Sequence, residues 1–221
     1  MPADVLMPVP VIHGAIGAFG KMPSQGDFFR FETPKGFVRA WDGWLQRTFP
    51  GARQTLGARW EECYYSAPIW RFSILPGVVT TNALAGVIMP SVDRVGRAFP
   101  LTLVCAVAPE SATADAHLAQ APFFFALEEI ALDALDDATT RESLAMSLRA
   151  FRDRCRSGML APVDRARCGV IVTRGVQSRC QWSSQLENGV VQLRTSGLPD
   201  LALLARMFDS ASTFWITEAA G

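Results

Sequence analysis

The 221-residue sequence predicts a single-domain α/β sandwich, in which a central mixed β-sheet carries helices on both faces. Apolar, extended segments interleave along the chain with segments of helical periodicity, which is the order expected of a layered α/β fold. Several predicted strands follow one another directly, which indicates a mixed sheet. Residues 11–217 contain no composition break or flexible linker. We therefore expect one domain at residues 11–221, preceded by a flexible leader at residues 1–10.

The first predicted strand and helix lie within the first 51 residues. His13–Gly20 is apolar and rich in glycine, which predicts a strand that another part of the chain approaches closely. Thr33-Pro34 resembles an N-cap and a first helical turn, and Pro50-Gly51 is expected to end this helix. Its apolar stripe is made of Phe37, Trp41, Trp44, Leu45 and Thr48.

Three further strands are predicted before residue 108. Ile69–Ile74 alternates between apolar and polar residues, as a half-buried strand does. Ala83–Met89 and Leu101–Val107 are continuous runs of small or branched apolar residues. Such runs are typical of central strands that are covered on both faces.

The second half of the chain is predicted to begin with two helices. Pro122 opens the first, and Thr139-x-x-Glu142 fits a capping box for the second. The buried face of the second helix is expected to hold Leu144, Leu148, Phe151 and Cys155. The elements expected after it are a buried strand at Cys168–Thr173, a hairpin turn at Asn188-Gly189, a short helix from Gly197-Leu198-Pro199 to Phe208, and a last strand at Thr213–Thr217.

Composition and charge exclude several functional classes. Apolar residues make up 49% of the chain, yet no apolar run reaches the roughly 18 residues of a membrane helix, so membrane insertion is not expected. The formal net charge of zero argues against nucleic-acid binding. The chain start lacks the pattern of a signal peptide, and the five cysteines lack metal-ligand spacing. A cytoplasmic protein with reduced thiols is therefore expected.

One short sequence motif, which begins with Met-Pro-Ser, occurs twice, each time after a predicted strand. Both copies bring turn residues, a hydroxyl and a carboxylate to a strand exit, with cationic side chains nearby. Asp27 and Asp93 can accept hydrogen bonds from amides of their own turns, and Arg94 or Arg97 can pair with them. Rigid loop architecture is the first role expected of both turns. The copies are Met22-Pro23-Ser24-Gln25-Gly26-Asp27 and Met89-Pro90-Ser91-Val92-Asp93-Arg94-Val95-Gly96-Arg97.

The glycine-rich strand exit before Lys21 could also be a ligand-binding or catalytic site. Closely spaced glycines precede Lys21, but a Walker loop needs Gly at Ala15 and Ser or Thr at Met22. We therefore expect no nucleotide and no other cofactor. Binding of a phosphate or another small ligand at this glycine-rich strand exit stays open as the alternative function, although no small-molecule substrate is expected.

Hydrolysis at the turn formed by Ser91 and Asp93 belongs to the same alternative. Nucleophilic catalysis would require a base beside Ser91. The chain has two histidines, His13 at the start of a strand and His117 in a polar, alanine-rich connection, and neither is an evident base. A metal site built from Asp27, Asp93 and His13 lacks diagnostic spacing, so no metal is expected.

Four stretches of the sequence resemble the TagF family of type VI secretion-associated proteins. They occur in family order, and the resemblance becomes compositional beyond residue 101, although Gly197-Leu198-Pro199 and Thr213–Thr217 also suit the family. The chain length fits the stand-alone form, without a fused phosphatase domain. The four stretches are Gly17–Phe29, Phe37–Gln46, Ala67–Phe72 and Gly86–Leu101.

This resemblance implies a cytoplasmic, non-enzymatic protein that represses type VI secretion after translation. The implied partner is the forkhead-associated scaffold protein of the secretion machine, which would be sequestered. The implied fold is an α/β sandwich, and the resemblance implies no catalytic residue.

Two groups of residues are candidates for the partner surface. The two turns are expected to converge at one edge of the sheet, and their candidate residues are Lys21, Ser24, Asp27, Ser91, Asp93, Arg94 and Arg97. The second candidate patch lies on the predicted helix that follows Thr139 and consists of Arg149, Arg152 and Arg156. Charge is unevenly distributed here, because residues 110–137 hold seven acids and no Lys or Arg, whereas residues 149–179 hold eight arginines and two acids.

Overall fold

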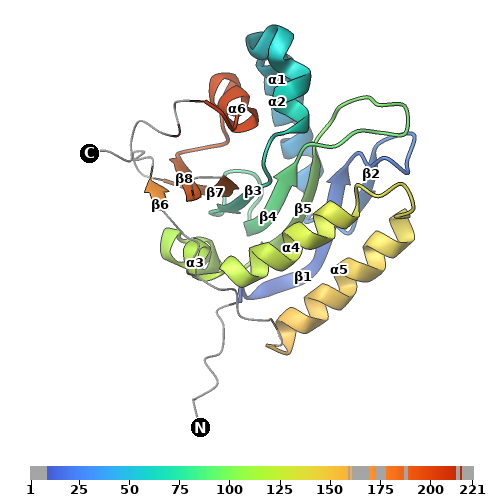
Figure 1. Cartoon of the computed structure of the whole chain (residues 1–221). Helices are drawn as coiled ribbons and strands as arrows, with labels where there is room; N and C mark the ends of the chain where they lie inside the picture. The colour runs from blue at the N-terminus through green and yellow to red at the C-terminus, as the bar shows by residue number, and fades with distance from the viewer. Residues whose placement is uncertain are drawn as a thin grey trace.

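The computed structural model describes residues 9–158, 160, 170–172, 178–186, 189–212 and 215. Within these residues the centre of the protein is an eight-stranded sheet in the order β2-β1-β5-β4-β3-β7-β8-β6 (Figure 1). The strands are β1 Ile12–Gly20, β2 Phe29–Phe31, β3 Trp70–Ile74, β4 Ala83–Met89, β5 Leu101–Val107, β6 Val170–Val172, β7 Cys180–Leu186 and β8 Gly189–Thr195. Their neighbours pair antiparallel except β6 and β8, which are parallel. The predicted mixed sheet is confirmed through that one parallel pair.

Helices cover both faces of the sheet, as predicted (Figure 1). One layer consists of α1 (Phe37–Leu56), α2 (Trp60–Tyr65) and α6 (Leu201–Phe208), with the 3₁₀ turn η1 (Gly57–Arg59) between the first two. The other layer consists of α3 (Ala114–Ala119), α4 (Ala121–Asp133) and α5 (Arg141–Arg156), after the 3₁₀ turn η2 (Pro109–Ala112). A separate apolar core lies under each layer.

The core under α1 is dominated by aromatic residues. The rings of Trp41 and Phe72 have centroids 5.0 Å apart, and Trp182 packs beside both. The indole N–H of Trp41 donates to Oγ1 of Thr102 at 3.0 Å. A buried indole usually finds such an acceptor. Trp41 and Trp182 are both buried in this core, and Trp41 lies there as its place on the predicted apolar stripe indicates.

The central strands β4 and β5 form at the predicted residues, and every residue in them is buried. Strand β3 also forms where expected, with Trp70 and Phe72 in the aromatic core. Its other face is not exposed to solvent, which differs from the expectation of a half-buried strand. Ser73 on that face is fully buried, because α3 packs over it.

Helix α1 runs six residues past the predicted end at Pro50 and stops at Leu56. Its buried stripe continues through Ala52 and Leu56, and Gly51 lies against Leu201 of α6. A Cβ atom at Gly51 would lie 3.4 Å from the Leu201 side chain. Packing against α6 therefore outweighs the hydrogen bond that Pro50 cannot make.

Two helix starts differ from the prediction. Helix α1 is preceded by Gly36 with φ of 82°, and Thr33-Pro34 lies in the turn before it. Helix α5 is capped by Thr140, whose side chain accepts from the Ser143 amide at 3.1 Å, and not by Thr139. Thr139 instead donates its hydroxyl to the carbonyl oxygen of Asp133, so it fastens the end of α4.

Most of the later elements agree with the prediction where the structure describes them, although the short helix, α6, begins at Leu201 and not at Gly197-Leu198-Pro199. Strands β7 and β8 pair antiparallel from Leu186 and Gly189, as a hairpin requires, and residue 188 of the predicted turn lies outside the described residues. Of the predicted strand at residues 168–173, the described part is β6. Trp215, the one described residue of the predicted last strand at Thr213–Thr217, lies in a 3₁₀ turn and not in a strand. Leader residues 1–8 are outside the described part.

His117 is not in an irregular connection, as the sequence suggested, but in α3. Thr113 caps this helix, and the imidazole is buried between two hydroxyls, with Nδ1 2.8 Å from Ser73 Oγ and Nε2 2.8 Å from Ser183 Oγ. Burial, together with the positive charges of Arg71 and Arg194, lowers the pKa of His117 to about 3. The imidazole is therefore neutral in the folded protein at any pH above this value.

Gly86 should tolerate no side chain. A Cβ atom there would lie 2.2 Å from the Leu103 carbonyl oxygen and 2.6 Å from the Phe72 ring. We expect Gly86→Ala to lower the free energy of unfolding by about 1–3 kcal/mol or more, measured by urea denaturation. Gly197→Ala is the matched control, because no atom lies within 4 Å of its added Cβ, and its effect should stay within about 0.5 kcal/mol. Equal effects of the two changes would contradict the close packing at Gly86.

Protonation of His117 should make stability depend on pH. The unfolded chain binds a proton at His117 below about pH 6.5, whereas the native protein does not bind it until about pH 3. Stability should thus fall as pH drops from about 6.5 to 5, with a slope approaching about 1.4 kcal/mol per pH unit. His117→Gln should flatten this slope in denaturation curves, while His13→Gln, which changes the exposed second histidine, should keep it. The same slope in all three proteins would refute the assignment.

Candidate functional site: the double turn

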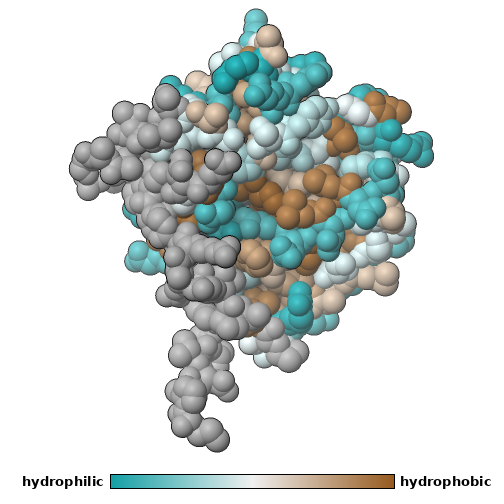
Figure 2. Space-filling view, viewed as in Figure 1, coloured by the Kyte–Doolittle hydropathy of each residue, from teal (hydrophilic) through white to brown (hydrophobic). Residues whose placement is uncertain are grey.

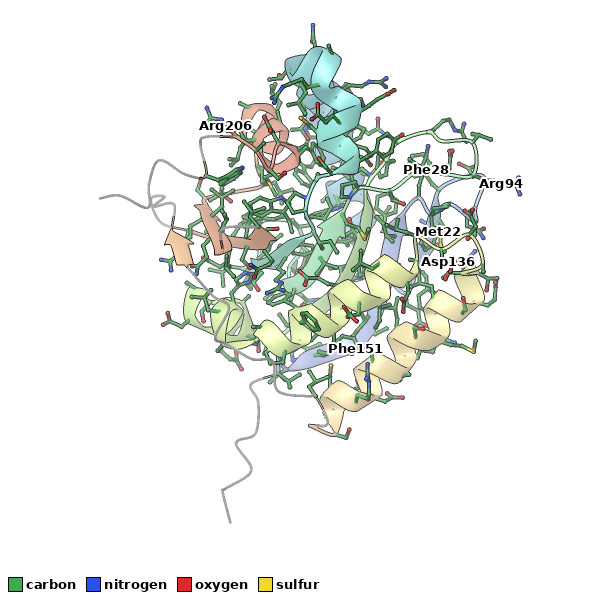
Figure 3. All side chains as sticks on the ribbon, viewed as in Figure 1. Met22, Phe28, Arg94, Asp136, Phe151 and Arg206 are labelled. Carbon is green, nitrogen blue, oxygen red and sulfur yellow. The ribbon has the colours of Figure 1, made fainter. Side chains whose placement is uncertain are left out.

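The two Met-Pro-Ser turns lie at the same end of the sheet. Strands β1 and β4 both pair antiparallel with β5, which lies between them. They therefore run in the same direction, and their exits are about 10 Å apart, the width of two strand spacings. We call residues 21–28 and 90–98 the double turn (Figure 3).

Hydrogen bonds join the two halves of the double turn directly. The Ser91 hydroxyl donates to the Lys21 carbonyl oxygen, and the Arg94 amide donates to the Gln25 carbonyl oxygen, each at 2.8 Å. The Arg97 guanidinium donates to the carbonyl oxygen of Gly26 at 2.8 Å. Tyr64 in α2 adds a further tie, because its hydroxyl donates to the Ser91 carbonyl oxygen at 2.8 Å and accepts from the Ser91 amide. The two turns are therefore one structural unit, and α2 anchors it.

A buried carboxylate organises this unit. Asp93 is 1% exposed, and its Oδ1 accepts from the amides of Val95 and Arg97 at 3.1 and 2.9 Å. Its Oδ2 lies 2.9 Å from Lys21 Nζ and 2.6 Å from Arg97 Nε. Burial raises the pKa of Asp93, but the hydrogen bonds from Lys21, Arg97 and Val95 lower it by more. The net pKa lies well below the ordinary value, so Asp93 is a permanent anion and not a general acid or base.

The candidate residues of the double turn divide into two groups by exposure. Lys21, Ser91 and Asp93 are buried, so they support the unit and cannot contact a partner. Asp27, Arg94 and Arg97 are exposed, whereas Ser24 is half-buried. Asp27 accepts from the amide of Phe28 at 2.8 Å, and Arg97 is held by Asp93.

Two exposed apolar residues of the double turn were not among the site residues predicted from the sequence. Val95 is 70% exposed and Phe28 is 45% exposed, and each stands next to a candidate residue in the chain. The Phe28 ring packs edge-on against Phe99, with centroids 4.7 Å apart, and Lys21 Nζ lies 4.9 Å from its centre. An apolar residue at the centre of a polar turn was the available signal for Val95. Figure 3 places Phe28 and Arg94 together at this end of the molecule.

The second candidate patch, on α5, is engaged within the chain. Arg149 forms an ion pair with Glu32 at 2.7 Å, and Arg152 pairs with its neighbour Asp153 at 2.9 Å. Arg156 donates to the Gly14 carbonyl oxygen at 3.2 Å. The three arginines fasten α5 to adjacent segments or to itself, and they are separate from the double turn.

The glycine-rich strand exit packs against the protein backbone. A Cβ at Gly17 would lie 2.4 Å from the Phe31 carbonyl oxygen. Gly20 has φ of +140°, and a Cβ there would lie 2.2 Å from the Pro100 carbonyl oxygen. These glycines therefore admit β2 and the start of β5, which accounts for the close approach that the sequence predicts.

The described residues offer little to the alternative chemistry. The Ser91 hydroxyl is buried and already donates a hydrogen bond, and the ring nitrogens of His117 contact serines of β3 and β7. No three metal-ligating side chains come together in the part of the chain that the structure describes. In the same part, no helix is long and apolar enough to cross a membrane.

Described residues line two surface hollows that do not include the double turn. The larger, of about 630 Å³, is formed by Arg179, residues 194–200 and Leu203. The smaller, of about 470 Å³, is formed by residues 30–36, Val38 and Arg39. Both are shallow, so they do not enclose a ligand.

Comparisons with known proteins identify the family. The crystal structure of PA0076 from Pseudomonas aeruginosa PAO1 is similar to this fold, with a TM-score of 0.67 and 26% sequence identity, and the match covers 88% of this chain and 94% of that chain. Among curated proteins, none matches the chain. Residues 17–151, which include the whole double turn, match the family model described as the TagF N-terminal domain, type VI secretion system-associated. This range exceeds half of the chain, and the protein therefore belongs to the TagF family of type VI secretion system-associated proteins.

Proposed function

We propose that this TagF-family protein is a non-enzymatic, cytoplasmic regulator that represses type VI secretion after translation. It acts by binding and sequestering the forkhead-associated scaffold protein of the secretion machine. Membership of the family carries this proposal, and the double turn supplies a surface that suits a binding role. Its internal charges are already used to hold it together, which leaves recognition to the exposed side chains.

The double turn is suited to recognition because it is rigid before binding. Ordering a loop on association costs free energy, and a preorganised loop avoids that cost. Arg94 is exposed and forms no ion pair with any residue that the structure describes. Arginine and aromatic side chains are enriched among the residues that dominate binding energy. Arg94, Val95 and Phe28 are therefore the proposed contact residues, with Asp27 and Arg97 at their border.

The other candidates have weaker support. The α5 patch is the second candidate for the partner surface, although its three arginines are engaged within the chain. Phosphate binding or hydrolysis at the glycine-rich strand exit is the alternative function. It has less support because Gly17 and Gly20 accommodate backbone, and Ser91 and Asp93 are buried with their hydrogen bonds made.

Reversing the exposed charge of the double turn should abolish capture of the scaffold protein. We expect Arg94→Glu combined with Val95→Asp to weaken the dissociation constant for the purified scaffold by about tenfold or more, measured by calorimetry. Arg97 is left intact, because it neutralises the buried Asp93. Charge reversal at Arg149 and Arg156 on α5 is the matched control and should leave the affinity within about threefold. Undiminished binding by a folded Arg94/Val95 variant would contradict the assignment of the site to the double turn. Loss of scaffold binding in the α5 variant alone would assign the site to α5.

Deletion of the gene should raise type VI secretion. Removing a repressor that acts after translation should increase the secreted substrate in the medium while cellular amounts of the scaffold and sheath proteins stay constant. Wild-type protein supplied in trans should restore repression, whereas the Arg94/Val95 variant should not. Secretion that neither rises nor becomes constitutive on deletion would disprove the repressor function, whatever the binding assay gives.

A further inference from the structure

The outward face of α4 is unusual for a surface helix, because it is apolar as well as acidic. A helix that covers a sheet normally turns charged or polar residues toward solvent. In α4, Phe125 and Leu132 face outward and are 45% and 48% exposed. They lie seven residues apart, which places them on one side of the helix. Figure 2, drawn in the view of Figure 1, shows apolar residues in the middle of this side of the molecule, between α1 and α4, with hydrophilic residues around them.

Exposed apolar side chains also occur in the chain just before and just after α4. Leu118 in α3 and Leu135 after α4 are also exposed, so four of the protein's exposed large apolar side chains occur within residues 118–135. The inner face of the same helix is fully occupied, since Phe124, Leu127 and Ala131 are buried against the sheet. No packing contact among the described residues accounts for the outer row.

Carboxylates are frequent in this segment, and most of them form no ion pair with a described residue. Residues 110–137 hold seven acids, of which Glu128 pairs with Arg71 at 2.7 Å. The other six form no ion pair with any residue that the structure describes, although the arginines of α5 lie on the neighbouring helix. Glu129 and Asp133 border the apolar row on α4, and Asp136 follows at the end that carries the double turn (Figure 3).

We propose that the outward face of α4, centred on Phe125 and Leu132, docks a cationic amphipathic helix of a partner protein. The apolar row would accept leucine-type side chains spaced at i, i+3, i+4 and i+7, while basic residues of the partner meet Glu129 and Asp133. Such complementarity of charge fixes register and excludes acidic partners. This surface is separate from the proposed contact residues of the double turn and does not depend on the proposed repressor function.

Charge decides between this occupant and two others. A second copy of the chain would bring α5, whose exposed side includes Glu142 and Asp153 together with its arginines. Those carboxylates would meet the acids of α4. A membrane surface rich in anionic lipids would likewise repel this face. A cationic helix is the occupant that buries the apolar row and neutralises the acids at once.

The test uses the full chain and a fluorescent peptide of about 18 residues, designed as an amphipathic helix with leucines on one side and lysines on the other. We expect saturable binding in fluorescence anisotropy. Phe125→Gln with Leu132→Gln, and separately Glu129→Lys with Asp133→Lys, should each weaken binding by about tenfold or more. Met146→Gln is the matched control, since Met146 is 64% exposed on α5 and should leave the affinity unchanged.

Further outcomes decide the proposal. A peptide of the same composition in scrambled order should bind at least about tenfold more weakly, because it cannot form an apolar face. Equal binding of the scrambled peptide, no binding by the wild type, or wild-type affinity in both folded α4 variants would overturn the proposal. Sedimentation that shows a dimer lost in Leu132→Gln would assign the face to a second copy instead, and binding to anionic vesicles lost in the same variant would assign it to a membrane. Thermal unfolding of each variant verifies that it is folded.

Discussion

Burial of β4 and β5 on both faces is the constraint on which the rest of the structure depends. Each of the fourteen residues in these two strands is buried, so the sheet requires a helical layer on each side. Gly86 sets the distance on one side, because only a residue without Cβ lets the Phe72 ring lie against β4. Trp41 of α1 then packs on Phe72, and α4 and α5 close the opposite face. The interior of the sheet thus fixes where both helical layers must lie.

The double turn follows from the same arrangement. The two strands that enter it lie on either side of β5, so their exits are close without being adjacent. The space between them holds Asp93, and a buried carboxylate is stable only when charges and amides satisfy it. Lys21 comes from one turn and Arg97 from the other, so neutralising Asp93 also fastens the turns together. The ion pairs and hydrogen bonds of Asp93 therefore determine the geometry of the double turn, whereas apolar packing determines the position of the helices on the sheet.

Local sequence patterns predicted most helices and strands. Features that depend on contacts between residues far apart in the chain could not be predicted from these patterns. Ala83–Met89 is an uninterrupted apolar run, which is typical of a central strand covered on both faces. The extension of α1 past Pro50 depends on α6, which lies about 150 residues later and shows no sign of its position in the local sequence. Lys21 and Asp93 are of the charged types most often found at surfaces, and their burial follows only once strand order brings the two turns together. Val95 and Phe28 are the reverse case, because they are apolar residues that the double turn leaves exposed.

The neutral net charge conceals an uneven field at the surface. Arg71, Arg97, Arg149 and Arg152 are each paired with a carboxylate, so their fields are largely cancelled at short range. Six carboxylates of residues 110–137 have no such partner among the described residues. A partner that approaches α4 therefore meets a negative potential, although the net charge of the whole chain is zero. Arg94 adds to the double turn an exposed positive charge that has no ion-pair partner among the described residues. A neutral protein with this arrangement can select partners of different charge at two surfaces, because recognition responds to local potential and not to the total.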